Sequence, residues 1–269
     1  MKFHHLLPIL LALVLLSGCE KDEKEELSLY PARDMALANS AFEDAFSMVD
    51  RVGKSEPGLR NNYGLPDCAN ASIDTLNFPF TITIDFGEDN CTGNNGVDRR
   101  GIIYVEVTGP YQDEGTTITT TLQDYYVMDH QVTGTRVVTN LGENEMGNLQ
   151  YSVVETDVTV TAPNESWTST WASDRTREWT DGQNTLWNPF DDGYEITGSA
   201  SGVSREGVPY SVEITQPLEA KVICPWVTSG VIELFPEDGF PMSVNYGGGT
   251  CDQQAVVTVN GNDYNIILN

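Results

Sequence analysis

The chain has 269 residues, of which 40 are acidic and only 14 are Lys or Arg, so its formal net charge at pH 7 is −26. Such a charge repels nucleic acid and anionic lipid, and we expect no nucleic-acid partner. His4 and His5 lie in the N-terminal apolar segment, so a chain that loses this segment keeps only His130. A zinc site built from several histidines is then excluded.

Residues 1–18 have the layout of a secretory signal peptide. Lys2 gives a positive start, and Leu6 to Leu16 form an apolar run that is shorter than the roughly 20 residues of a membrane span. Leu16-Ser17-Gly18-Cys19 resembles the lipobox of bacterial lipoproteins, in which the cysteine takes a diacylglycerol group and becomes the new N-terminus. We therefore expect lipid on Cys19 to hold the mature chain at a membrane.

Residues 19–29 form an acidic tether after the anchor. The run from Glu20 to Glu26 contains only charged side chains, which stay solvated. A lysine followed by acidic residues beside the lipidated cysteine also resembles the surface-export signal of Bacteroidetes-type lipoproteins. This resemblance predicts a lipid-anchored protein on the outer face of the outer membrane; a periplasmic orientation is the alternative.

Residues 30–269 are expected to form a single β-rich domain that opens with one helix at about residues 31–52. Apolar residues recur there at intervals of three and four, which predicts a helix with one face packed on a sheet. The members of this stripe are Ala38, Ala41, Phe42, Ala45, Val49 and Val52.

Beyond Ile73 the sequence alternates between apolar and polar residues, with many β-branched and aromatic side chains. Gly134, Gly142, Gly147 and several Asp-Gly and Asn-Gly pairs are expected to mark turns. Short connections of this kind predict a mainly β fold, a long antiparallel meander folded as a sandwich, a curled sheet or a barrel. The predicted strands are 80–86, 102–107, 116–122, 125–132, 136–140, 149–161, 166–179, 194–204, 210–216 and the C-terminal segments.

Two similar sequence units lie near the two ends of this domain. Ile84-Asp85-Phe86-Gly87 is followed by three residues and Cys91, and Val244-Asn245-Tyr246-Gly247 is followed by three residues and Cys251. In each copy a strand comes next. The sequence therefore contains two related strand-turn-cysteine units, at about residues 68–107 and 224–259.

The repeat also predicts how the cysteines pair. Besides Cys19 there are four cysteines, an even number that is typical of disulfides in an exported protein, and spacing alone leaves three pairings open. Because each unit has one earlier cysteine, we expect Cys68 to pair with Cys91 and Cys224 with Cys251. Each bridge closes a loop of about two dozen residues and contributes about 3.5 kcal/mol in the chain-entropy model. Structural zinc is the weaker alternative, because no Cys-x-x-Cys spacing is present.

One predicted strand carries a candidate ligand-binding face. Alternation between residues 166 and 180 places Trp167, Trp171, Arg175, Arg177 and Trp179 on the same side. Aromatic and basic side chains together can stack on sugar rings and bind hydroxyl or carboxylate groups. The alternative is that these residues cover the core of the sheet or pack on the helix.

Other polar groups indicate no definite site. A glycine-rich loop holds many oxygen ligands that suit calcium, but their order does not match an EF-hand and turn chemistry explains them equally well. Paired carboxylates can serve a glycoside hydrolase, although no spacing singles out an acid and a base. We expect no metal, no cofactor and no catalytic residue. The loop residues are Asp85, Glu88, Asp89, Asn90, Asn94, Asn95 and Asp98.

Several motifs resemble those of a group of Bacteroidetes-type surface lipoproteins that carries no established activity. They are Leu16 to Cys19, Ile82 to Gly87 leading to Cys91, Tyr246 to Asp252, and the Asn260-Gly261 hairpin. The resemblance implies an address and an architecture but transfers no catalytic residue. We expect a non-enzymatic surface binding or structural module whose partner is a glycan or another surface protein. A carbohydrate-active enzyme with a carboxylate pair is the alternative.

Overall fold

The computed structural model describes residues 28–53, 65–74, 79–93, 95–185, 188–224 and 226–268. The predicted signal peptide, Cys19 and residues 20–27 lie outside these ranges. The described elements are the helix α1 (Tyr30–Gly53), the strands β1 (Asn70–Asp74), β2 (Phe80–Asp85), β3 (Cys91–Thr92), β4 (Asp98–Val107), β5 (Thr117–Val127), β6 (His130–Glu143), β7 (Leu149–Thr161), β8 (Thr168–Asp181), β9 (Gly193–Val203), β10 (Pro209–Lys221), β11 (Ser229–Pro236), β12 (Met242–Gly248), β13 (Gln254–Val259) and β14 (Asn262–Ile267), and the 3-10 helices η1 (Pro163–Glu165) and η2 (Pro189–Asp191).

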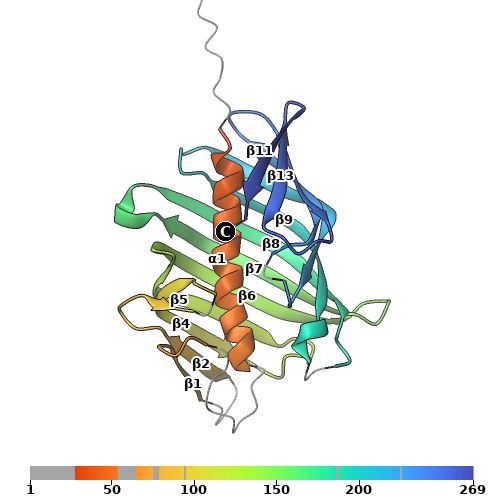
Figure 1. The fold of residues 1–269 in the computed structure, drawn as a ribbon. Coiled ribbons are helices and arrows are strands. Elements are labelled where there is room, and N and C mark those ends of the chain that lie inside the picture. The colour runs from red at the N-terminus through yellow and green to blue at the C-terminus, as the bar shows by residue number, and fades with distance from the viewer. Residues whose placement is uncertain are drawn as a thin grey trace, which may run out of the picture.

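The strands form one open 14-stranded antiparallel sheet, in which they follow one another in chain order. The two-residue β3 departs from this order and pairs with one end of β4. Short hairpin connections keep consecutive strands adjacent, and the twist that accumulates across so many strands curls the sheet. Of the forms predicted from sequence, the structure therefore has the curled sheet, which bends around α1 (Figure 1).

The structure has one turn that the sequence does not predict, and it continues a strand through two glycines at which turns are predicted. The predicted strand 125–132 is interrupted by a tight turn at Met128 and Asp129, whose φ angles are 46° and 61°. Such angles suit a two-residue hairpin, but the turn lacks the glycine that usually marks one. Gly134 and Gly142, both expected in turns, lie inside β6, at two points where its register with β7 shifts. Both take part in β-bulges, which bend a strand without ending it.

The helix α1 crosses the concave face of the sheet, at a steep angle to the strands (Figure 1). Every residue of the predicted apolar stripe is at most 5% exposed, so the predicted packing of the helix on a sheet is confirmed. The stripe joins the inward side chains of both ends of the sheet in one core, for example Ile82 and Ile103 near the start and Val244 and Val257 near the end. Burial of each such side chain contributes about 1.5–3 kcal/mol. No described helix combines the length and the apolar character that crossing a bilayer requires.

The opposite, convex face of the sheet is rich in small hydroxyl side chains. Thr117, Thr139, Ser152, Thr176 and Thr197 lie opposite one another on five neighbouring strands. Their neighbours in sequence point inward, which explains the alternation in the sequence.

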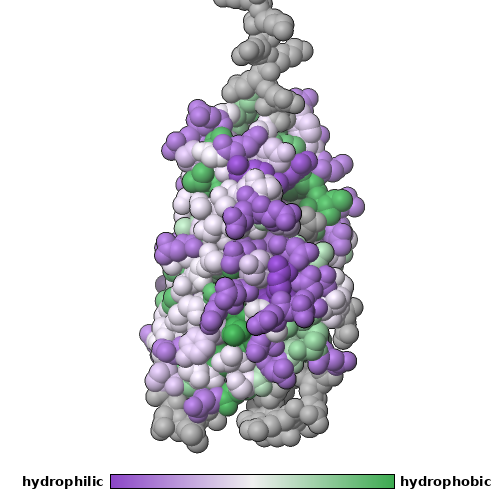
Figure 2. Space-filling view, turned by 90° about the vertical axis from the view of Figure 1, so that its left-hand side faces the viewer, coloured by the Kyte–Doolittle hydropathy of each residue, from purple (hydrophilic) through white to green (hydrophobic). Residues whose placement is uncertain are grey.

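The strand ends on the left of Figure 1 are mainly hydrophilic, with separate hydrophobic side chains among them (Figure 2).

Two disulfides fasten loops at the two ends of the sheet. Cys68 pairs with Cys91, which ties the segment before β1 to β3. Cys224 pairs with Cys251, which ties the β10–β11 turn to the β12–β13 loop. These are the pairs that the internal repeat predicts.

Candidate functional site

Helix α1 covers the face of β8 on which the sequence predicts ligand binding. Four of the five side chains share one face of β8, as the alternation requires, but that face is the concave one and α1 lies over it. The fifth, Trp167, comes just before the strand. Trp171 and Trp179 are each only 2% exposed. The proposed stacking on a sugar ring therefore does not hold for these two tryptophans, because neither has an open ring face.

Trp171 is held by buried polar groups. Its indole N–H donates to Glu155 Oε2 (2.7 Å), which also accepts from the Ser173 hydroxyl (2.9 Å). The guanidinium of Arg175 lies 5.1 Å from the centre of the Trp171 ring and donates to Asn39 Oδ1 of α1 (2.6 Å). Arg175 thus joins β8 to the helix and is not free to bind a ligand.

Trp167 takes part in a group of contacts that holds the start of α1. The guanidinium of Arg205, in the β9–β10 turn, lies 3.7 Å from the centre of the Trp167 ring and 4.8 Å from that of Tyr30. Arg205 also donates from Nε to Asp34 Oδ1 (2.7 Å) and from its backbone N–H to Asp34 Oδ2 (2.7 Å). Ser28, just before the helix, donates to Glu206. The first turns of α1 are therefore fastened to one turn of the sheet.

Trp179 belongs to a separate aromatic cluster near the other half of α1. Tyr194 stacks against Trp179 with ring centres 5.8 Å apart, and Tyr111 stacks on Tyr151 at 4.7 Å. The guanidinium of Arg177 lies 3.6 Å from the centre of the Tyr194 ring. The last predicted ligand residue thus also packs inside the fold.

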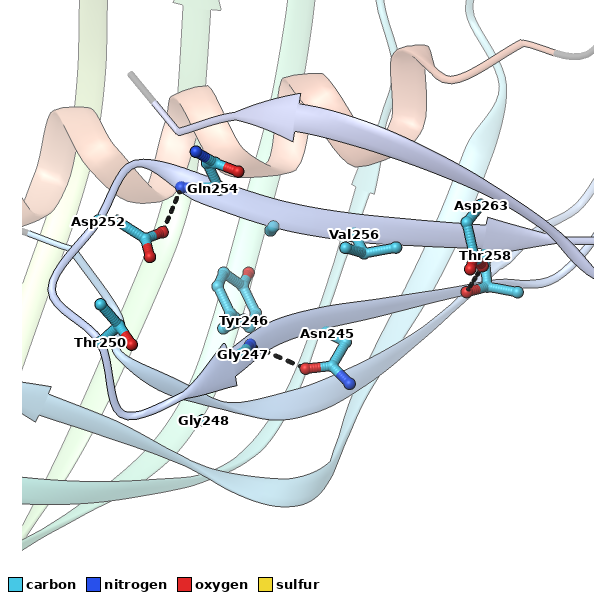
Figure 3. Close-up of a pocket in the computed structure, with 11 residues that line it drawn as sticks. Asn245, Tyr246, Gly247, Gly248, Thr250, Asp252, Gln254, Val256, Thr258 and Asp263 are labelled. Atoms are coloured by element: carbon cyan, nitrogen blue, oxygen red, sulfur yellow. Dashed lines mark hydrogen bonds between the residues drawn. The ribbon is translucent and has the colours of Figure 1, made fainter.

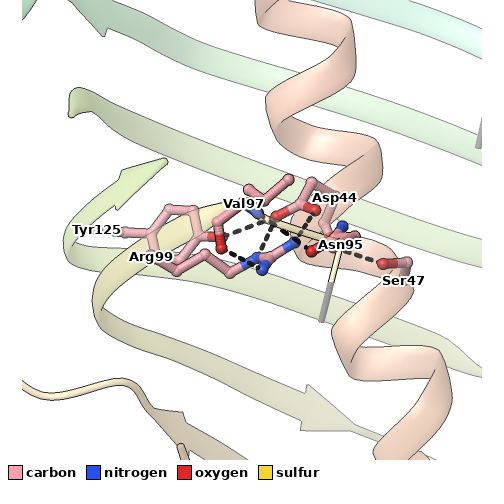
Figure 4. A network of polar contacts seen from close by, with 6 residues as sticks. All are labelled: Asp44, Ser47, Asn95, Val97, Arg99 and Tyr125. Carbon is pink, nitrogen blue, oxygen red and sulfur yellow. Dashed lines mark hydrogen bonds and ion pairs between the residues drawn. The ribbon is translucent and has the colours of Figure 1, made fainter. Parts of the chain in front are cut away.

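The same face carries two further arginines that pair with acids of α1. Arg99, 1% exposed, donates from Nε to Asp44 Oδ2 (2.7 Å) and forms an ion pair with Asp44 Oδ1 (Figure 4). Burial alone lowers the pKa of Arg99, but the hydrogen bonds and charge of Asp44 outweigh it and the net pKa is raised. Tyr125 donates to the same carboxylate (3.3 Å); burial, followed by the charge of Asp44, raises its pKa.

Arg136 lies between two carboxylates. It donates to Glu43 Oε1 of α1 (2.8 Å), and its Nε lies 3.7 Å from Glu155 Oε1. Burial by itself raises the pKa of Glu43, but the charge of Arg136, followed by those of Arg177 and Arg175, lowers the net pKa. The carboxylates beneath the helix are thus engaged with arginines.

Some members of the predicted loop of oxygen ligands accept hydrogen bonds from other residues of the fold. Asn90 and Asp129 both accept from Arg100 (2.7 Å each), and Thr92 donates to Asp98 (2.5 Å). Asn94 lies outside the described residues. Within the described ranges, no group of three or more His, Cys, Asp or Glu is placed to hold a metal ion.

A pocket opens instead where the sheet splays at β12 and β13. These strands pair only as far as Asn245 and Val256. Beyond that point β12 continues beside β11, while the start of β13 pairs with β14. The gap, of about 450 Å³, is within the size range of small-ligand sites. Tyr246 lies in it between the two strands (Figure 3).

The pocket combines an aromatic ring with polar side chains. Tyr246 is half-buried, and burial raises its pKa to about 12 in spite of the nearby charge of Arg175. Asn245 Oδ1 accepts from the backbone N–H of Gly247 (2.8 Å), which fixes its amide at the rim. Gly247 has φ +94°, a conformation that favours glycine and allows the tight turn. Thr250, Asp252, Gln254, Thr258 and Asp263 complete the polar lining (Figure 3).

No sequence pattern predicts this pocket as a site. Tyr246 to Asp252 is one of the resemblance motifs and the repeat predicts a disulfide beside it, but alternation gives no indication that two strands will separate. The Cys224–Cys251 bridge now fastens the loop that lines the pocket. Comparison of the chain with protein families, curated proteins and solved structures gives no match.

Proposed function

We propose that this chain is a lipid-anchored extracytoplasmic binding module that recognises a glycan in the β12–β13 pocket and catalyses no reaction. The observation that carries the proposal is the composition of the pocket, an aromatic ring beside amide, hydroxyl and carboxylate groups. A sugar offers an apolar ring face and many hydroxyl groups, which such a lining can stack on and hydrogen-bond.

The cellular address rests on two kinds of observation. The two disulfides indicate an extracytoplasmic protein, because such bonds persist in oxidising compartments. The lipobox-like sequence at Cys19 and the acidic residues after it support a lipid anchor and export to the outer surface. The resemblance to Bacteroidetes-type lipoproteins supports the same address.

The start of α1 and the loop that lines the pocket contact opposite ends of strand β10. The chain enters the fold at Ser28 and Tyr30, beside the β9–β10 turn. The β12–β13 loop is linked by its disulfide to the β10–β11 turn, at the other end of strand β10.

A binding assay tests the recognition. We expect at least one oligosaccharide from a calorimetric panel of neutral and charged sugars to bind the mature chain. Tyr246→Ala should weaken the best of them at least tenfold, since loss of one stacked ring and its contacts costs more than about 1.4 kcal/mol. The matched control is Tyr104→Ala, because Tyr104 is a tyrosine 41% exposed on β4, outside the pocket. Equal loss in both variants, or no binding by any sugar, would contradict the proposal. Cleavage of the bound sugar would favour the alternative enzyme.

A second experiment tests the anchor. In cells that process lipoproteins, Cys19→Ser should release the protein into the soluble fraction and prevent labelling by radioactive palmitate. Protease added to intact cells should degrade the wild-type chain if it faces outward. Full protection would place it in the periplasm, and palmitate labelling of the Ser variant would exclude Cys19 as the acylated residue.

A further inference from the structure

The β12–β13 pocket carries acidic groups and no basic ones. Asp252 and Asp263 line it, and none of its 11 lining residues, all within the described chain, is Lys, Arg or His. Asp252 accepts a hydrogen bond through Oδ1 from the backbone N–H of Gln254 (2.9 Å), and Asp263 accepts through Oδ1 from the Thr258 hydroxyl (2.7 Å). The Oδ2 atoms make no hydrogen bond to the described residues, so both carboxylates can accept from a ligand.

We infer that the ligand of this pocket bears primary ammonium groups, as in a glycan with unacetylated amino sugars. This inference rests on the proposed function and narrows its ligand class. A neutral sugar that displaces water from the two carboxylates leaves their charge uncompensated, whereas an ammonium group brings up to three donors and the opposite charge. The net charge of −26 favours cations in the same way.

The positive charge of Arg175 does not cancel the negative charge of the pocket. Arg175 affects the pKa of Tyr246, but its guanidinium donates to Asn39 and lies over Trp171, on the side that faces α1. It therefore moderates the preference for cations without offering a donor to the ligand. The remaining lining groups can bind the sugar hydroxyls that an amino sugar also carries.

The test compares ligands of equal length and different charge. The probes are glucosamine oligomers, their fully N-acetylated counterparts and oligogalacturonate, with spermidine as an ammonium compound that is not a sugar. At low salt and slightly acidic pH, the glucosamine oligomer should bind about tenfold more tightly than the N-acetylated one. This is the product of roughly threefold gains at the half-buried Asp252 and the exposed Asp263. The difference should shrink at high salt, because screening acts on exposed charges.

Asp252→Asn should reduce this preference roughly threefold, and Asp238→Asn, an exposed acid in the β11–β12 turn, should leave it unchanged. Equal binding of the two oligomers would overturn the inference and leave the glycan function standing. Binding of spermidine that depends on Asp252, without binding of any sugar, would keep ammonium recognition and overturn the glycan function. Tightest binding of oligogalacturonate, or no binding by any probe, would overturn the inference.

Discussion

The ion pair between Arg99 and Asp44 allows a quantitative test of how α1 is held in the sheet. Arg99 is 1% exposed, while the Asp44 side chain is 18% exposed. Removal of one member of a buried pair costs about 3–5 kcal/mol, because the other charge stays desolvated without compensation. We expect Asp44→Leu, which strands the more deeply buried arginine, to fall in this range. Arg99→Met should cost less, about 2–3 kcal/mol, because Asp44 can regain some water.

The double variant Arg99→Met/Asp44→Leu distinguishes the interaction energy of the pair from the cost of leaving one charge buried alone. Replacing both charges with apolar groups should cost about 1–3 kcal/mol, because the buried Tyr125 hydroxyl loses its acceptor, and this is less than the sum of the two single costs. Urea denaturation of the mature chain without its lipid measures these free energies; a loss of 3–5 kcal/mol lowers the midpoint by about 1–2 M. The control is Arg100→Met, because Arg100 pairs with the exposed Asp129 and should contribute under about 1 kcal/mol. Equal shifts for Arg99→Met and Arg100→Met, or additive single costs, would refute the reasoning.

Three further predictions concern other parts of the fold. Burial raises the pKa of Glu43, but the charge of Arg136 outweighs it and the net pKa in the folded chain is lowered. This carboxylate therefore contributes stability above its unfolded pKa of about 4.3, and the contribution is lost as pH falls through the folded pKa. Glu43→Gln should make the urea midpoint fall less between neutral and acid pH. Serine at both Cys224 and Cys251 should cost about 3.5 kcal/mol and lower the melting temperature seen by circular dichroism, and an unchanged melting temperature would contradict the loop-closure argument. Gly101→Ala should cost more than about 2 kcal/mol in the same urea assay, because φ is +89° and the new Cβ would lie 2.0 Å from a backbone oxygen of β5. The control is Gly87→Ala, which has a similar φ of +82° but open space around it and should cost about 1 kcal/mol.

Local periodicity accounts for what could be predicted of the fold. The strands and the apolar stripe of α1 follow from the side-chain period of each element, which neighbouring residues fix by themselves. The cysteine pairs follow from a repeat that is visible in the sequence. The turn at Met128 and Asp129 is not predicted because it contains no glycine and methionine is unusual at positive φ. The turns expected at Gly134 and Gly142 are wrong because glycine serves bulges as well as turns.

What covers a face, and where strands part, depends on contacts between distant segments. Alternation correctly placed Trp171 and Trp179 on one side of β8, but only the docking of α1, more than a hundred residues earlier, decided that this side is buried. The pocket around Tyr246 likewise exists because β12 stays with β11 while β13 turns toward β14. The sequence by itself determined the strands, the helix and the cysteine pairs, since each depends on spacing along the chain. The tertiary structure decided which aromatic and acidic groups remain available to a ligand, because availability depends on every segment that packs nearby.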